Sequence, residues 1–178
     1  KFIYILRDPR KMMRSFKNLP RVKTDGNQDG ESRQYHPAVY ALYWKNAYEK
    51  VQAFRAKAIA PVEVVKFEDL VRSPEAVAQR LADFLETQVS GNVIAEKSNS
   101  SLKNGPPKEL TSTEIMLCEK IAGPAMRSAG YPLSGSSLHL FDILDLLKTS
   151  ATFTRYQLER IATNKKARTS VIAFIKSI

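Results

Sequence analysis

The first apolar residues of the chain form one short run, and a helical pattern follows directly. Residues 2–6 are almost all aromatic or aliphatic, which is typical of a strand covered on both faces in a parallel sheet. Asp8 can cap the helix that follows, and Pro9 is tolerated at its first position because no donor is needed there. The sequence therefore predicts a buried strand that runs straight into a helix.

A second strand followed by a helix comes later in the chain. Residues 37–57 carry apolar side chains at helical spacing, and residues 62–67 form the next strand candidate. Ser73 is then expected to cap a helix that begins at Pro74. Two strand-and-helix units joined by a helical crossover predict an α/β fold with a parallel sheet flanked by helices.

Two long polar loops and one further helix complete this region. Residues 18–37 are interpreted either as a substrate loop or as a plain linker, and residues 87–110 as a second loop. Thr111 and Glu114 have the spacing of a capping box for a helix over residues 112–129. The Gly123-Pro124 pair is expected to kink or split that helix.

The last part of the chain is expected to be a helical extension. Residues 134–137 look like a linker, and residues 138–147 and 153–178 are interpreted as two separate helices. We therefore expect an α/β part over residues 1–132 and a C-terminal helical extension over residues 133–178. Residues 138–178 of this extension could contact a partner or a second copy. A packing helix with a solvated basic face is favoured over a membrane-binding helix.

Charge narrows the range of partners. The chain of 178 residues has a formal net charge of +10, which points to nucleotides, nucleic acid or sulfated sugars. Residues 1–23 alone hold eight Lys or Arg residues and one acid. The single cysteine, Cys118, is expected to be a core residue, and it favours a reducing, cytoplasmic location. No apolar run is long enough for a membrane span.

Arg7 and Ser15 are the candidate anion-binding residues. Arg7 follows the first strand, and ligands of open α/β sheets bind at the carboxyl ends of strands. Ser15 lies about two helical turns further on, so both side chains could face one phosphate. The planar guanidinium matches phosphate oxygens, and helix-end amides add donors. The alternative is a surface arginine and an ordinary helical serine.

Two stretches together resemble the sulfotransferase family, which transfers sulfuryl from 3′-phosphoadenosine 5′-phosphosulfate to a hydroxyl or an amine. They are residues 1–9 with Ser15, and residues 65–70 followed by Ser73-Pro74 and Phe84-Leu85. The resemblance implies a P-loop-like sheet, no metal, and binding of the 3′-phosphate of the donor by Arg7 and Ser15. The product would be adenosine 3′,5′-bisphosphate.

Two further positions match the family less well than these stretches do. Phe67 stands where the family commonly has tyrosine, so a hydroxyl contact is lost while contact with adenine could remain. Lys103, Asn104 and Gly105 are candidates for the family's late basic loop on the 3′-phosphate. The resemblance extends over about residues 1–132.

The family's glycine-rich 5′-phosphosulfate loop and its general base have no counterpart in the chain. Both come before the segment that opens this sequence, and His36 and His139 lie in unsuitable contexts. No catalytic residue is therefore assigned. We expect these residues to be the C-terminal part of a larger catalytic domain with an incomplete sheet.

Two other functions stay open at the level of sequence. One is a basic nucleic-acid-binding module, although its aromatic residues at positions 2–4 are predicted to be buried. The other is a nucleotide-binding or scaffolding remnant without transfer activity. The acceptor is unknown in every case, and no binding of nucleic acid is expected from the favoured reading.

Overall fold

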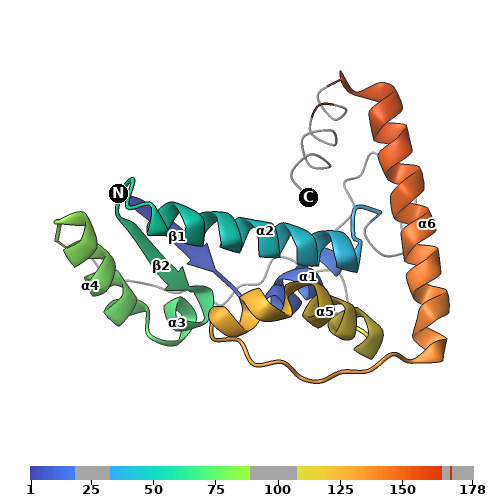
Figure 1. Cartoon of the computed structure of the whole chain (residues 1–178), viewed down its shortest axis with the longest axis horizontal. Coiled ribbons are helices and arrows are strands. Elements are labelled where there is room, and N and C mark those ends of the chain that lie inside the picture. Colours follow the sequence, from blue (N-terminus) through green and yellow to red (C-terminus); the bar gives the residue numbers. More distant parts are fainter. Residues whose placement is uncertain (19–32, 89–107, 166–168, 170–178) are drawn as a thin grey trace.

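The computed structural model describes residues 1–18, 33–88, 108–165 and 169. Its elements follow in the order β1 (Phe2–Leu6), α1 (Pro9–Lys17), α2 (Pro37–Ala56), β2 (Val62–Lys66), α3 (Phe67–Arg72), α4 (Pro74–Leu85), α5 (Ser112–Ser128) and α6 (Leu140–Thr163) (Figure 1). The two strands and α1 to α5 form the body of the molecule, and α6 runs along one end of it.

The sheet has the parallel arrangement that the sequence predicts. β1 pairs with β2 in a register that sets Phe2 opposite Val62 and Leu6 opposite Lys66. α2 is the crossover between them and lies along the sheet on α5 (Figure 1). Its Trp44 packs in the core with Leu6. The predicted α/β fold is therefore confirmed. It consists of a small parallel sheet, and most of the other described residues are helical.

The predicted burial of β1 on both faces is wrong for three of its five residues. Phe2, Ile3 and Ile5 are 56%, 42% and 58% exposed, and Leu6 is buried. Within the described residues the sheet has two strands, so β1 is an edge strand. α3 and α4 pack on the β2 side, and the apolar side chains of β1 therefore remain in contact with solvent.

The core is formed mainly by side chains of α1, α2 and α5, together with Leu6 at the end of β1. Met13 of α1, Trp44 of α2 and Met126 of α5 are among its buried members. Trp44 stacks on Tyr48 with ring centroids 5.5 Å apart. Cys118 is fully buried, and burial raises the pKa of its thiol to about 12. It is the core residue that the sequence predicts.

The second strand-and-helix unit differs from its prediction in detail. β2 ends at Lys66, one residue early, because Phe67 begins α3, a short helix that the sequence pattern did not indicate. α4 begins at Pro74 as expected, but the side chain of Ser73 makes no capping hydrogen bond. The carbonyl oxygen of Ser73 accepts from Val77 N instead, so the backbone alone starts this helix.

α5 begins where the sequence predicts, but it continues past the expected break at Gly123-Pro124. Thr111 and Glu114 form a complete capping box. The helix then continues through Pro124 to Ser128, so the expected split is wrong. Pro124 lies on the exposed side of the helix, where water can solvate the carbonyl that loses its donor. Gly130 has a φ of +75° and ends the segment.

α6 is one helix, although two were predicted. The helix runs through the weakly apolar region around Ser150, whose hydroxyl donates to the carbonyl oxygen of Leu146 and lies 3.1 Å from Nε2 of His36. The carboxylate of Asp142 accepts from Thr113 N and ties the helix start to α5. His36, which lies at the end of the predicted loop over residues 18–37, is half-buried against Phe153 of α6.

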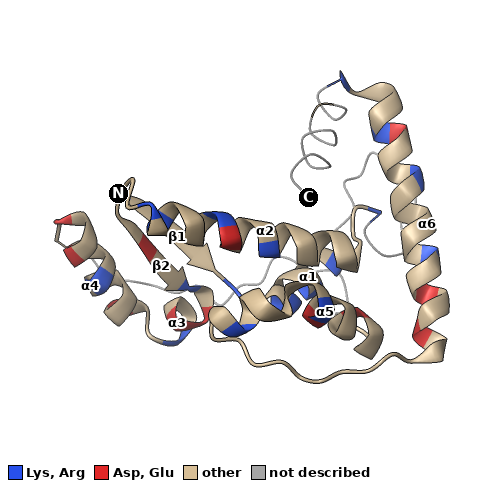
Figure 2. Cartoon of the chain, viewed as in Figure 1, with Lys and Arg blue, Asp and Glu red and all other residues tan. Residues whose placement is uncertain are grey.

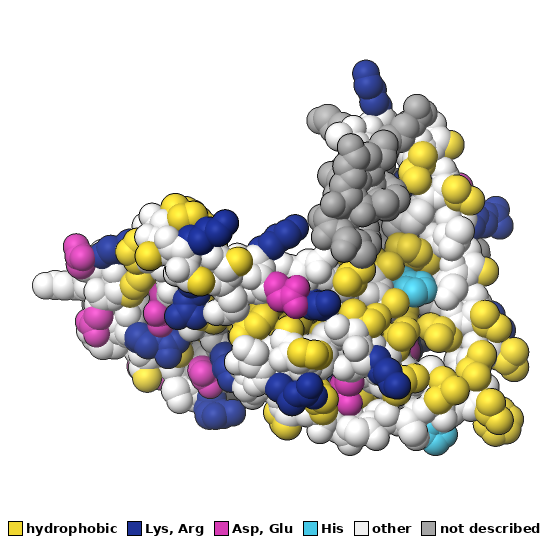
Figure 3. All heavy atoms as spheres, in the orientation of Figure 1, with side chains coloured by type: hydrophobic (Ala, Val, Ile, Leu, Met, Phe, Trp, Pro, Cys, Tyr) yellow, Lys and Arg dark blue, Asp and Glu magenta, His cyan; other side chains and the backbone are white. Residues whose placement is uncertain are grey.

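Hydrophobic side chains recur along the outer side of α6 (Figure 3). The exposed ones are Leu140, Phe141, Leu144, Leu147 and Leu158. Of the helices that the structure describes, none combines the length and the apolar content of a membrane span. The division of the chain at residue 133, and the predicted partner contact of residues 138–178, stay predictions.

Candidate functional site

The candidate site lies where both parallel strands end. Leu6 and Lys66 are paired at the carboxyl ends of β1 and β2. The chain leaves β1 through Arg7 into α1, and it leaves β2 directly into α3 at Phe67. The carboxyl edge of a parallel sheet, next to the N-terminus of the nine-residue helix α1, is a favourable place for an anion.

Arg7 is held at this edge by contacts on both its backbone and its side chain. Its carbonyl oxygen accepts a hydrogen bond of 2.8 Å from Trp44 Nε1. Its guanidinium carbon lies 4.5 Å from the centroid of the Phe67 ring, a cation–π contact. Its Nε is buried and has no hydrogen-bond partner. The side chain is therefore positioned while part of its donor capacity is unused.

The other basic residues of the opening segment are paired with acids. Six of its eight Lys and Arg residues are described, and all of these except Arg7 form ion pairs. Figure 2 shows where basic and acidic positions lie along the chain. The pairs are Lys1 with Glu86, Arg10 with Asp8 and Glu119, Lys11 with Glu68, Arg14 with Glu109, and Lys17 with Glu114. Arg7 is thus the cation that stays without an acidic partner in residues 1–18.

A network missed by the sequence reasoning holds the turn between β1 and α1. Asp8 caps α1 by accepting from Arg10 N at 2.9 Å, and its other oxygen accepts from the Arg10 guanidinium at 2.7 Å. Arg10 also donates to Glu119 of α5 at 2.8 Å. The hydrogen bond to Asp8 raises the pKa of Arg10. The turn that presents Arg7 is therefore tied to α5.

Glu119 keeps its charge although it is buried. Desolvation alone would raise the pKa of its carboxyl, but hydrogen bonds from Ser134, Arg10 and Gly135 outweigh that effect and lower it. Both the backbone N–H and the hydroxyl of Ser134 donate at 2.8 Å. The only sequence signal for this partnership was an acid on the inner face of a predicted helix.

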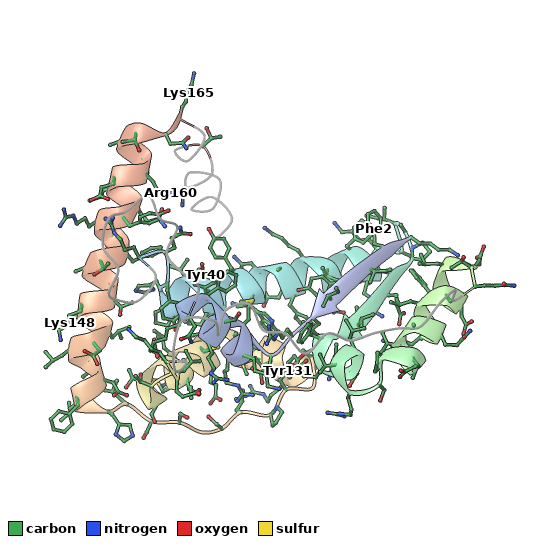
Figure 4. The ribbon with its side chains drawn as sticks, turned by 180° about the vertical axis from the view of Figure 1, so that it is seen from behind. Phe2, Tyr40, Tyr131, Lys148, Arg160 and Lys165 are labelled. Carbon is green, nitrogen blue, oxygen red and sulfur yellow. The ribbon has the colours of Figure 1, made fainter. Side chains whose placement is uncertain are left out.

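Glu68 connects the same turn to the second strand unit. One carboxylate oxygen accepts from Asp8 N at 3.2 Å, and the other accepts from the hydroxyl of Tyr131 at 3.1 Å. Burial and the neighbouring Glu68 charge raise the pKa of Tyr131, so its phenol stays protonated. Figure 4 shows Tyr131 beside the strand ends. Glu68 therefore has a structural role as an acceptor between α1, α3 and Tyr131.

The structure describes some of the predicted site residues and not others. It brings Arg7 and Phe67 into direct contact, and it places Ser15 on α1, within two turns of that helix's start and partly exposed. The joint action of Ser15 with Arg7 on one anion stays a prediction. Lys103, Asn104 and Gly105 lie outside the described residues. Within the described part of the chain, no cluster of His, Cys, Asp or Glu side chains could hold a metal ion.

Comparison with known proteins agrees with this geometry. The model of the sulfotransferase family matches residues 1–91, just over half of the 178-residue chain. Both stretches that carry the resemblance, residues 1–15 and 65–85, lie within the match. A search of curated proteins and a search of solved structures found no match. The chain therefore belongs to the sulfotransferase family.

Proposed function

We propose that this chain binds the 3′-phosphoadenosine end of a sulfuryl donor, 3′-phosphoadenosine 5′-phosphosulfate. Arg7 and Ser15 would hold the 3′-phosphate, and Phe67 would contact the adenine. Lys103, Asn104 and Gly105 would close on the same phosphate. The parent activity is transfer of sulfuryl to a hydroxyl or an amine, and the chain's own residues contribute positioning of the donor.

The observation that carries the proposal is the unpaired guanidinium of Arg7. Five neighbouring cations are neutralised by carboxylates, whereas Arg7 lies at the strand end without an acidic partner. Its Nε is buried and makes no hydrogen bond; the Nε of Arg14 is also unpartnered, but the Arg14 guanidinium pairs with Glu109. A buried donor that makes no hydrogen bond costs free energy, because it has lost its contacts with water. A phosphate with nearly two negative charges could satisfy that donor, and the planar fork of Arg suits its oxygens.

The reaction consistent with this role is an in-line displacement at sulfur. The acceptor oxygen or nitrogen forms a bond to sulfur while the bond between sulfur and the phosphate oxygen breaks. Adenosine 3′,5′-bisphosphate leaves with that electron pair, and a general base takes the acceptor proton. We assign neither that base nor the group that stabilises the leaving phosphate to a residue of this chain.

Calorimetric titration of adenosine 3′,5′-bisphosphate and adenosine 5′-monophosphate tests the proposal. Wild-type protein should prefer the bisphosphate, and Arg7→Ala should lose about 1.5–3 kcal/mol of binding free energy, the value of a charge-assisted hydrogen bond. Arg14→Ala is the matched control, because Arg14 lies on α1 and already pairs with Glu109. Equal affinity of the wild type for the two nucleotides would refute the proposed function.

The ion pairs made by the described cations of residues 1–18 give no support to a nucleic-acid-binding module. Such a module needs several cations free to contact successive phosphates, and the described cations of residues 1–18 other than Arg7 have acidic partners. The same titration with a single-stranded oligonucleotide separates the two functions. Tight, salt-dependent binding of the oligonucleotide with no preference for the bisphosphate would favour the module.

A further inference from the structure

A pocket of about 380 Å³ opens beside Arg7, on the side of β1 away from β2. Its walls come from three elements: Tyr4 and Arg7 from the β1 segment, Phe16 from α1, and Tyr40 and Trp44 from α2. Figure 4 shows Tyr40 where α1 and α2 approach each other. The volume falls within the range of about 300–1,000 Å³ that small-molecule sites occupy.

The walls are aromatic and already ordered by contacts among themselves. Phe16 stacks on Tyr40 with centroids 4.3 Å apart. Tyr40 meets Tyr43 edge-on at 6.5 Å, and the Trp44 indole is fixed by its hydrogen bond to Arg7. Burial raises the pKa of the Tyr4 and Tyr40 phenols, so both stay neutral near pH 7. A flat apolar ring would find a preformed, uncharged surface.

The charges of the lining residues favour some ring-bearing ligands over others. Of its nine lining residues, Arg7 is charged and none is acidic. A protonated amine would have to leave water without a carboxylate partner in the pocket lining, which is unfavourable. A neutral hydroxyl has no such cost, and it can bond with tyrosine hydroxyls of the wall.

We propose that this pocket binds the acceptor, and that the acceptor is an apolar aromatic alcohol and not an alkylamine. The inference rests on the proposed function, because Arg7 contacts Phe67 of the donor site and is also one of the residues that line this pocket. It concerns binding only and adds no bond-making step. It assigns a substrate class where the family alone allows a hydroxyl or an amine.

The test uses the whole 178-residue chain and a matched pair of probes, 2-(2-naphthyl)ethanol and 2-(2-naphthyl)ethylamine. The chain has one tryptophan, so its amide correlation spectrum contains one indole N–H signal, from the Trp44 group that borders the pocket. The alcohol should shift this signal with saturation. The amine, which is protonated at pH 7, should bind at least about tenfold more weakly.

Ala47→Leu and Ala53→Leu provide matched variants on α2. Both alanines are exposed and helical, but only Ala47 lines the pocket. Leucine at position 47 should fill the opening and weaken binding of the alcohol by about tenfold or more. Leucine at position 53 should leave binding unchanged. Because both changes place a good helix former on a solvent-exposed helix face, both variants are expected to fold.

The outcomes separate the pocket from the donor site. No saturable shift of the Trp44 signal, equal binding of the amine, or equal binding by Ala47→Leu would overturn the inference. Dimers seen in sedimentation and lost in Ala47→Leu would also overturn it, because a second copy would then occupy the pocket. Binding of adenosine 3′,5′-bisphosphate without binding of the alcohol removes this inference alone. Binding of the alcohol without the bisphosphate refutes the proposed function and the acceptor role with it.

Discussion

The buried ion pair between Lys17 of α1 and Glu114 of α5 should control the stability of the site's supporting helix. Lys17 Nζ lies 2.8 Å from Glu114 Oε2, and the two side chains are 5% and 7% exposed. The same carboxylate oxygen also accepts from Thr111 N at 2.8 Å, and Lys17 reaches the carbonyl oxygen of Glu109 at 3.2 Å. Each charge therefore keeps a polar contact when its partner is removed, but the ion pair between the two side chains is lost.

We expect Lys17→Met and Glu114→Gln each to lower the free energy of unfolding by about 3 kcal/mol, because each removes one partner of a buried ion pair. The double variant removes both charges and keeps the side-chain volumes, so it should cost much less than the sum. The resulting coupling energy between the two sites should be about 3 kcal/mol.

Urea unfolding of the four proteins, followed by the emission of the buried Trp44, measures this coupling. The exposed pair of Lys148 with Asp145, 3.5 Å apart, is the control and should show coupling near zero. A single variant that does not fold while the double variant does would also support the reasoning. Additive losses in the buried pair would refute it.

Two further predictions concern the turn after α5 and the Glu119 network. Gly130→Ala should destabilise the protein by about 1 kcal/mol, because φ is +75° there and the new Cβ would lie 2.9 Å from Lys66 Nζ. Gly123→Ala, where the nearest atom is 3.5 Å away in a helix, should stabilise it by up to about 1 kcal/mol. Thermal melting of both variants checks the pair, and shifts in the same direction would contradict it. The lowered pKa of Glu119 means that its contribution to stability is present above the ordinary glutamate pKa and is lost as the pH falls through the folded value. The stability difference between wild type and Glu119→Gln should therefore shrink as urea unfolding is repeated from pH 7 to pH 3, and a constant difference would exclude this assignment.

Local signals predicted the elements of this fold well. Asp8-Pro9 and the Thr111 and Glu114 capping box act within a few residues, and the structure has both helix starts where the sequence placed them. The errors came from contacts that local patterns do not contain. The middle of α6, which the sequence pattern leaves as a gap between two helices, contacts His36 through Ser150 and Phe153, and the exposure of Ile5 depends on which strands and helices flank β1.

The candidate site was predictable only in outline. The strand ends place Arg7 and Phe67 at one edge, but their contact depends on the register of two strands about sixty residues apart in sequence. Pairs such as Arg10 with Glu119 join residues 109 positions apart. No periodicity or spacing encodes such partners, so the sequence indicated a strongly basic opening segment where the structure has mostly neutralised side chains.

That neutralisation changes what the protein's overall basicity means. The attraction of a single guanidinium for an anion fades over a Debye length, about 8 Å at physiological ionic strength, whereas a cluster of free cations would guide anions from further away. Because the described cations of α1 are matched by acids, an isoelectric point near 9.7 overstates the field around the opening segment. Under the proposed function, recognition at Arg7 would therefore depend on shape and hydrogen-bond geometry at close range, which suits discrimination between nucleotides that differ by one phosphate.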